Sequence, residues 1–143
     1  MENDLIICDI DGTIALRRED RQGCRGPFDW DRVDEDEPNP AVVALVKLLY
    51  SSGYDIVFMS GRMRQCSAKT RQWLDRHVGV SYSLYMRADD DYRPDTVVKR
   101  EMYEMYIPSY CAPAFVLDDR NSVVKMWREE LKLTVLQVAD GDF

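Results

Sequence analysis

Short apolar runs alternate along this chain with stretches that have the apolar spacing of helices, and this alternation limits the folds open to it. Near-continuous apolar runs of strand length are typical of parallel strands that are covered on both faces. Strands that alternate with helices predict an α/β sheet. The five runs cover residues 5–8, 55–59, 82–86, 114–117 and 133–138.

The clearest helix lies between the first two runs. Asn39 stands at its capping position, Pro40 is its first residue, and Gly53 ends it. Its apolar stripe consists of Val42, Val43, Leu45, Val46, Leu48 and Leu49. Further helices are predicted over residues 68–78, 95–107 and 121–131.

The stretch 17–38 is the least regular part of the sequence and includes the acidic run 34–37. We interpret it as a functional loop, because connections of this length are uncommon unless they have a role.

Size and charge narrow the function classes. With 143 residues the chain is predicted to form a single domain, residues 1–143. The net charge of −7 argues against broad, nonspecific adhesion to nucleic acid or to an anionic membrane, although a small basic site is compatible with it. There is no apolar run long enough to span a membrane, and the first residues lack the basic start of a secretory signal, so a cytoplasmic location is expected.

The cysteines do not form a metal-binding pattern. Four are scattered along the chain without a Cys-x-x-Cys pair, and His77 is the one histidine that could join them. Reduced thiols without a structural metal are expected, and His77 is given a structural role near a helix end.

Two carboxylates follow the first apolar run directly, in the segment Asp9-Ile10-Asp11-Gly12-Thr13. The carboxyl ends of the strands are the edge at which open α/β sheets bind ligands. Residues two apart in an extended segment point to the same side, and two like charges that converge need a cation or a shared proton. Mg²⁺ together with a phosphate would meet that need. The alternative is an ordinary acidic turn.

Other polar residues are expected at the same edge. Ser60-Gly61-Arg62 follows the second run, Asp118-Asp119 follows the fourth, and Asp95 and Lys99 open the helix between the third and fourth. Scattered surface turns would have no reason to converge in this way, so a shared site is favoured. For Asp95 and Lys99 alone, a surface ion pair between residues i and i+4 is the alternative.

In this order the motifs resemble the haloacid dehalogenase superfamily of phosphotransferases. A more specific resemblance rests on Arg25-Gly26-Pro27-Phe28-Asp29, Ser60-Gly61-Arg62, Asp95-Thr96-Val97-Val98-Lys99, Asp118-Asp119-Arg120 and the segment from Gln137 to Phe143. With these segments the chain resembles the phosphatase domain of phage-type polynucleotide kinase-phosphatases. The resemblance implies one phosphatase domain folded as a Rossmann-like three-layer sandwich with a central, mainly parallel five-stranded sheet. Neither gap after the first motif or the third run is long enough for a large cap domain.

The resemblance and the chemistry of phosphate release assign roles to the carboxylates. Asp9 would be the nucleophile that forms an aspartyl-phosphate, and Asp11 the general acid that later becomes the base for water. Asp9, the backbone carbonyl of Asp11 and Asp119 would hold Mg²⁺ directly, with Asp118 nearby or binding through water. The choice between Asp118 and Asp119 as direct ligand is left open.

The remaining site residues are predicted to bind the phosphoryl group or to position its ligands. Lys99 would neutralise charge, while Ser60, Thr13 and backbone N–H groups would hydrogen-bond the oxygens. Asp95 would fix the position of Lys99. Arg25 and Arg62 would contact the scissile phosphate or a neighbouring phosphodiester, the alternative being solvated loop arginines.

The implied activity is that of a Mg²⁺-dependent polynucleotide 3′-phosphatase that heals or repairs DNA or RNA ends, with a footprint of few nucleotides. Two alternatives remain: a phosphatase of free nucleotides or other small phosphomonoesters, and a non-catalytic module that binds nucleic acid ends. DNA or RNA preference and oligomeric state are not decided by the sequence.

Two other phosphoryl-transfer classes are excluded by spacing. Four residues separate Cys66 from Arg71, one fewer than the loop of a cysteine phosphatase needs, and the chain has no Gly-Lys for a nucleotide-binding loop. A kinase function is therefore not predicted for this chain, and a separate kinase or ligase partner is compatible with the resemblance. If the domain is encoded by a phage, as the resemblance implies, the expected cytoplasmic location is the cytoplasm of the host cell.

Overall fold

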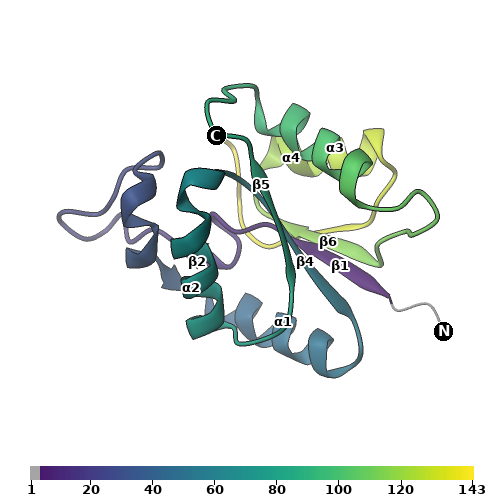
Figure 1. The fold of residues 1–143 in the computed structure, drawn as a ribbon, viewed down its shortest axis with the longest axis horizontal. Helices are drawn as coiled ribbons and strands as arrows, with labels where there is room; N and C mark the ends of the chain where they lie inside the picture. The colour runs from purple at the N-terminus through teal and green to yellow at the C-terminus, as the bar shows by residue number, and fades with distance from the viewer. Residues whose placement is uncertain (1–3) are drawn as a thin grey trace.

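A five-stranded parallel sheet forms the centre of the computed structural model, which describes residues 4–143 (Figure 1). The first three residues, which contributed to the expectation that no signal is present, lie outside the described part. The strand order is β5-β4-β1-β6-β7, and every neighbouring pair is parallel. The predicted parallel sheet is confirmed. The strands are β1 (Leu5–Cys8), β4 (Asp55–Met63), β5 (Ser83–Arg87), β6 (Phe115–Asp118) and β7 (Val135–Gln137).

Alternating residues of the strands enter two separate apolar cores, one on each face of the sheet. Ile6 and Cys8 pack with residues of α1 (Pro40–Ser51) and α2 (Ser67–His77). Leu5 and Ile7 pack with residues of α3 (Asp95–Tyr106) and α4 (Asn121–Lys125). Because side chains in a strand alternate between the two faces, continuous apolar runs fill both cores. The helices lie on opposite sides of the sheet in Figure 1, which confirms the three-layer sandwich.

The central position of β1 determines where its carboxylates emerge. β1 pairs with β4 on one side and with β6 on the other. The backbone that leaves Cys8 therefore enters the middle of the carboxyl edge, where Asp9 and Asp11 can face residues from either neighbouring strand.

The strand predicted from the second apolar run, residues 55–59, is longer than predicted. β4 continues to Met63, so Ser60, Gly61 and Arg62 lie within the strand and do not follow it. Between Ser60 and Met63 the pairing with β5 is irregular, and it resumes between Met63 and Arg87. An irregularity of this kind redirects side chains at a strand end.

The fourth helix changes geometry before it ends. The single helix predicted for residues 121–131 is divided into α4 and a π-helical turn, η3 (Met126–Glu130). The turn contains Trp127, which is fully buried and donates its indole N–H to Asp118 at 3.1 Å. The wider turn is thus associated with a contact to the carboxyl edge of the sheet.

The first helix begins at Pro40 as predicted, but the Asn39 side chain does not cap it. Instead its Nδ2 donates to the backbone carbonyl of Thr13 at 3.0 Å. The side chain therefore ties the helix start to the segment that follows β1.

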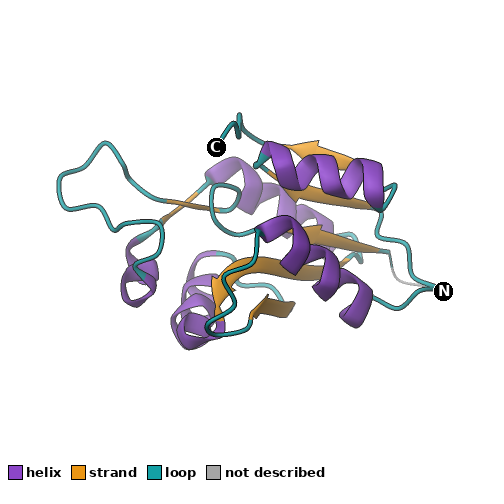
Figure 2. Cartoon of the chain, turned by 90° about the horizontal axis from the view of Figure 1, so that it is seen from above, coloured by secondary structure: helices purple, strands orange, loops and turns teal. Residues whose placement is uncertain are grey.

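The irregular segment is enclosed by a small second sheet. β2 (Ala15–Leu16) pairs antiparallel with β3 (Glu37–Pro38), and a short 3-10 helix, η1 (Trp30–Glu35), lies between them. In Figure 2 this loop extends away from the layers of the sandwich. Within residues 4–143 neither this connection nor the one between β5 and α3 forms a separate folded cap.

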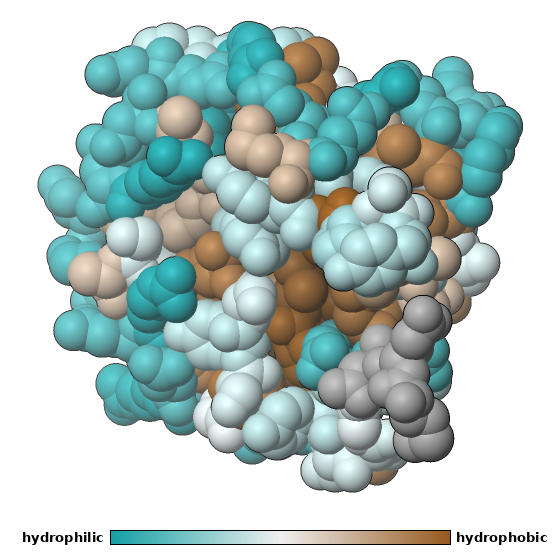
Figure 3. All heavy atoms as spheres, turned by 45° about the vertical axis from the view of Figure 1, so that its right-hand side comes forward, coloured by the Kyte–Doolittle hydropathy of each residue, from teal (hydrophilic) through white to brown (hydrophobic). Residues whose placement is uncertain are grey.

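Two further observations complete the fold. None of the helices in the described part of the chain has the length and apolar character needed to cross a membrane. The face seen in Figure 3 is mostly hydrophilic, with apolar side chains gathered in its middle, and some apolar exposure of this kind is normal for a protein surface.

Candidate active site

Two groups of charged side chains meet at the carboxyl edge of the sheet. We call Asp9, Asp118, Asp119 and Lys99 the acidic cluster. We call Asp11, Asp36, Arg25 and Arg62 the arginine cluster. Asp9 and Asp11 come from the same segment after β1, and each belongs to a different cluster.

The acidic cluster brings residues from β1, α3 and β6 into direct contact. Ligand atoms of the three aspartates lie within 4.8 Å of one another, and all three residues are buried. Lys99 Nζ donates to Asp9 Oδ1 at 2.7 Å and to Asp118 Oδ2 at 3.2 Å. Thr13 Oγ1 lies 2.9 Å from Asp9 Oδ2 and 3.1 Å from Asp119 Oδ1. A hydroxyl has one proton, so Thr13 can satisfy only one of these two carboxylates at a time.

The charges of the acidic cluster do not balance, because three carboxylates face one ammonium group. Burial and the neighbouring Asp118 raise the pKa of Asp9 well above its usual range, and Lys99 offsets this only in part. Burial, with Asp118, also raises the pKa of Asp119. Burial alone would lower the pKa of Lys99, but Asp118 and Asp9 outweigh it and raise that pKa. A divalent cation would neutralise the excess negative charge.

The Asp119 carboxylate lies where a side chain on Gly12 would be. Gly12 has a φ of +79°, and a Cβ atom on it would stand 2.2 Å from Asp119 Oδ2. A larger residue would therefore displace that carboxylate. The backbone turn after Asp11 and the position of Asp119 depend on the same glycine.

The oxygens of Asp118 already accept several hydrogen bonds. Oδ1 accepts the backbone N–H of Asp119 at 2.8 Å, while Oδ2 accepts from both Lys99 and Trp127. Asp9 and Asp119 have fewer such partners, so their oxygens are the more available ligands for a cation.

In the arginine cluster all three nitrogens of the Arg62 guanidinium form hydrogen bonds. Its Nε lies 3.1 Å from both carboxylate oxygens of Asp11, and its Nη2 lies 2.8 Å from Asp11 Oδ1 and 2.9 Å from Asp36 Oδ2. Its Nη1 donates to Thr70 Oγ1 at 3.1 Å. This guanidinium thus bridges two carboxylates from distant parts of the chain.

Arg25 makes a paired contact with Asp36. Its Nε and Nη2 each lie 2.7 Å from one Asp36 oxygen, and Nη2 lies 3.1 Å from Asp11 Oδ1. The side chains of Arg25, Arg62 and Asp36 are 1%, 0% and 0% exposed, whereas that of Asp11 is 41% exposed. Asp11 is the member of the cluster that solvent or a ligand can reach.

The two clusters shift the pKa of their aspartates in opposite directions. Burial favours the neutral form of Asp11, but the Arg62 guanidinium, its hydrogen bonds and Arg25 outweigh this effect and lower the pKa of Asp11. Two arginines match two carboxylates, so this cluster is balanced.

Several predicted roles are corrected or sharpened by this geometry. The alternative of solvated loop arginines is wrong, because Arg25 and Arg62 are buried against Asp11 and Asp36. The role given to Asp95 is also wrong: its oxygens pair with Arg87 and with Arg120, the latter at 3.0 Å, and no hydrogen bond or ion pair joins it to Lys99 within residues 4–143. Lys99 extends instead to Asp9 and Asp118.

Ser60 is fully buried, and its Oγ accepts the backbone N–H of Arg62 at 3.1 Å. It lies on the strand next to β1, at the same edge of the sheet as Asp9. Contact of Ser60 with phosphate stays a prediction.

Asp36 was not singled out from the sequence. It belongs to an acidic run in which only Asp36 is buried, and its backbone carbonyl accepts the indole N–H of Trp73 at 2.8 Å. Nothing in the spacing of the run distinguishes it from its neighbours. The position between two buried arginines appears only in the folded chain.

Comparison with known proteins gives this site a family. Residues 3–143 match the family model described as the polynucleotide kinase PNKP phosphatase domain. The chain is 38% identical over 137 residues to a candidate bifunctional polynucleotide kinase/RNA ligase of Autographa californica nuclear polyhedrosis virus, with coverage of 93% of this chain and 19% of that protein.

Solved structures agree with this match. A chain in a structure of the Pnkp1/Rnl/Hen1 complex superposes with a TM-score of 0.90 at 36% identity, covering 98% of this chain and 47% of the other. The class C acid phosphatase of Bacillus anthracis with tungstate bound shares the fold, with a TM-score of 0.62 at 20% identity over 86% of this chain and 54% of that one. The chain thus spans about a fifth of the viral relative and about half of the chain in the complex. It belongs to the family of polynucleotide kinase PNKP phosphatase domains.

Proposed function

We propose that residues 1–143 form a single Mg²⁺-dependent phosphatase domain that removes the 3′-phosphate from DNA or RNA ends through an aspartyl-phosphate intermediate. The observation that carries this proposal is the division of two carboxylates between two clusters. Asp9 lies with Lys99 in an acidic cluster suited to a cation, and Asp11 lies half-exposed beside two arginines. In the free protein these surroundings raise the pKa of Asp9 and lower that of Asp11, so bound Mg²⁺ would have to favour the ionised form of the nucleophile, and bound phosphate the protonated form of the proton donor.

Asp9, Asp119 and the backbone carbonyl of Asp11 would hold Mg²⁺, with Asp118 binding through water. Three observations support this set: the excess negative charge, the space kept open at Gly12, and the occupied oxygens of Asp118. Oxygen donors are the ligands that Mg²⁺ prefers. When bound, the ion would offset negative charge on the phosphoryl oxygens.

The chemistry would use the two carboxylates in turn. The Asp9 carboxylate attacks phosphorus and the bond to the 3′ oxygen breaks, while Asp11 gives its proton to that oxygen. Asp11 then takes a proton from the water that hydrolyses the aspartyl-phosphate. Lys99, hydrogen-bonded to Asp9, lies where it can stabilise charge on the phosphoryl group.

Binding of the phosphate would help Asp11 to act as an acid. In the free protein the arginines lower its pKa, so Asp11 is ionised near neutral pH. A phosphate that approaches Arg25 and Arg62 competes for their charge and places further negative charge beside Asp11. Both effects raise the pKa of Asp11 and favour its protonated form.

An open site suits the end of a polymer. No folded cap covers the edge in residues 4–143, and caps are what enclose small substrates in many enzymes. The structural relative comes from a complex with Rnl and Hen1, and the viral relative is named as a kinase/ligase. We propose by analogy that a kinase or ligase acts with this domain, and that it works in the cytoplasm.

The proposal is tested with two matched oligonucleotides, one phosphorylated at the 3′ end and one at the 5′ end. Phosphate release in the presence of Mg²⁺ is measured for wild type and for Asp9→Asn. Release from the 3′ end alone, lost in the variant, is the expected result. If neither oligonucleotide reacts while a small phosphomonoester does, the polymer substrate is wrong.

A further inference from the structure

We propose that a groove along the outer side of β5 binds the single-stranded nucleic acid that leads to the 3′ end; this rests on the proposed function. The groove has a volume of about 310 Å³ and lies between α2 and α3. Its polar lining comes from Arg64, Ser67 and Arg71, and its aromatic lining from Tyr85 and Tyr106.

One end of this groove lies at the rim of the active site. Met86 lines the groove and pairs with Ser60 across the sheet, and Arg64 follows Arg62 by two residues. Arg71 lies about one helical turn further along α2 than Ser67, so it continues the groove away from the rim. Because β5 is the edge strand, its outer side faces no further strand of residues 4–143 (Figure 1).

The charge of the groove is opposite to that of the whole protein. Arg64 and Arg71 are both exposed, and neither forms an ion pair within residues 4–143, although the chain carries a net charge of −7. No carboxylate is among the lining residues. A local positive patch on an acidic protein favours a polyanion over a neutral ligand.

The aromatic lining suits nucleobases. The rings of Tyr85 and Tyr106 stack on each other, with centroids 4.3 Å apart and planes 5° apart, so a base would stack on an outer face of this pair. Tyr82, over whose ring Arg71 lies at 6.0 Å, is not among the residues that line the groove. Cationic grooves with aromatic faces bind single strands by pairing the phosphates with arginine and stacking the bases.

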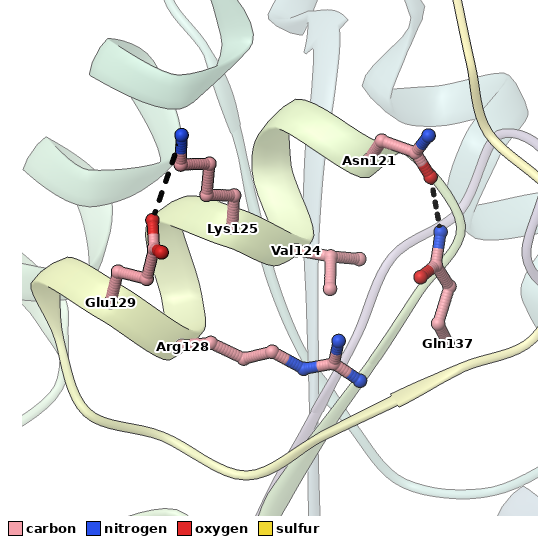
Figure 4. A pocket seen from close by; sticks show the side chains of 6 residues that line it. All are labelled: Asn121, Val124, Lys125, Arg128, Glu129 and Gln137. Carbon is pink, nitrogen blue, oxygen red and sulfur yellow. Dashed lines mark hydrogen bonds and ion pairs between the residues drawn. The ribbon is translucent and has the colours of Figure 1, made fainter.

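A second pocket at the opposite edge of the sheet is less suited to a polyanion. It has a volume of about 220 Å³ and includes Glu129, whose carboxylate pairs with Lys125 at 3.9 Å (Figure 4). Arg128, which also lines it, donates to the backbone carbonyl of Val135. A peptide strand added to β5 is another occupant that an edge strand could take, but it would leave the two arginines unexplained.

The test compares KM for two substrates in four variants. The substrates are a 3′-phosphorylated oligonucleotide and p-nitrophenyl phosphate, which is too small to reach the groove. The variants are Arg64→Ala, Arg71→Ala, the double variant, and Arg76→Ala as a matched control. Arg76 is exposed on α2, the helix that also carries Arg71. It has no ion pair in the described part of the chain and does not line the groove.

We expect KM for the oligonucleotide to rise about fivefold in each single variant, with p-nitrophenyl phosphate unaffected. Each lost arginine should also reduce the slope of log KM against log salt by about 0.7, since a phosphate contact to single strands releases counterions. Arg76→Ala should match wild type. The proposal is overturned if the groove variants behave like the control, as a peptide-binding edge would require, or if KM rises equally for both substrates.

This outcome is separable from failure of the proposed function. If wild type releases no phosphate from the oligonucleotide, the proposed substrate is wrong, and the groove is then tested by fluorescence anisotropy with a labelled, unphosphorylated oligonucleotide. Weaker binding by the double variant than by Arg76→Ala supports the groove on its own. Equal binding overturns it.

Discussion

The acidic cluster and the arginine cluster lie at the same edge of one sheet, yet they solve opposite electrostatic problems. In the arginine cluster each buried charge has a partner of opposite sign, so the cluster can hold itself together. In the acidic cluster Lys99 alone faces three buried carboxylates. The balanced cluster needs no further charge, whereas the unbalanced one needs either a bound cation or protons retained by its carboxylates.

The comparison also explains why two aspartates two residues apart can differ in chemistry. Burial and like charge raise the pKa of Asp9, while the arginines lower that of Asp11. The difference comes from the neighbours on either side of β1, since β6 supplies Asp118 and β4 supplies Arg62. The central strand therefore divides two roles between two adjacent environments.

Among the substitutions that test the difference between the two clusters, Asp9→Asn should have the largest effect on activity. Loss of the nucleophile should reduce phosphate release from the 3′-phosphorylated oligonucleotide by about 10⁴-fold. The fold should survive, because the substitution removes one unbalanced charge. A melting curve measured without divalent cation is the control, and undiminished turnover would show that Asp9 is not the nucleophile.

The role of Asp11 is separated from that of Asp9 by the leaving group. Asp11→Asn should slow release from the oligonucleotide by about 10²- to 10³-fold, the usual contribution of a general acid. Release of p-nitrophenolate in the first turnover should fall far less, because p-nitrophenolate leaves without needing a proton, whereas hydrolysis of the aspartyl-phosphate, in which Asp11 acts as base, is slowed for both substrates. Single-turnover rates of leaving-group release on both substrates decide this, and an equal loss in that step would contradict the acid role.

The balanced cluster should lose stability when one partner is removed. Asp36→Asn leaves two buried guanidinium groups facing Asp11 alone and should lower the free energy of unfolding by about 3 to 5 kcal/mol. Urea denaturation measures the loss, with Asp34→Asn as the control, since Asp34 is an exposed neighbour in the same acidic run. If both variants unfold alike, the contacts of Asp36 contribute nothing to stability.

The stability that Mg²⁺ adds through the acidic cluster should depend on pH. The folded pKa values of Asp9 and Asp119 are raised, so without the ion these two groups hold more protons in the folded protein than in the unfolded chain. Their contribution to the free energy of unfolding therefore falls as the pH rises above the ordinary aspartate pKa of about 3.9.

Mg²⁺ binds the ionised carboxylates, so its stabilising effect should grow with pH and reach about 2 kcal/mol at saturating ion. Thermal melts at pH 5 and pH 8, with and without Mg²⁺, measure this effect. Asp119→Asn should abolish it. A larger effect at pH 5 than at pH 8 would contradict the assignment of the cluster.

The sequence predicted those parts of the molecule in which a local pattern carries the information. Apolar runs located the five strands, and the positions of Asp9, Lys99 and Asp119 at the carboxyl edge followed from those runs. The extension of β4 and the π-helical turn were missed, because a strand irregularity and a buried Trp127 depend on packing between distant elements.

The side-chain partners that the sequence did not reveal have the same cause. Arg62 and Asp36 are separated by 26 residues, and Asp95 and Arg120 by 25, so no helical or strand period relates the members of either pair. Which of several acidic residues pairs with a given arginine is determined by how the folded chain brings distant segments together at the sheet edge.

The contact between Arg25 and Asp36 has a consequence for chain entropy. It joins two points eleven residues apart and so acts as a clasp on the exposed loop that contains Phe28, itself 79% exposed. Once the clasp is closed, the entropy cost of a longer loop grows only with the logarithm of its length, about 0.6 kcal/mol for a doubling. The exposed start of this segment, around Phe28, can therefore change in length and composition while Val33 of η1 stays buried and Asp11 keeps its place.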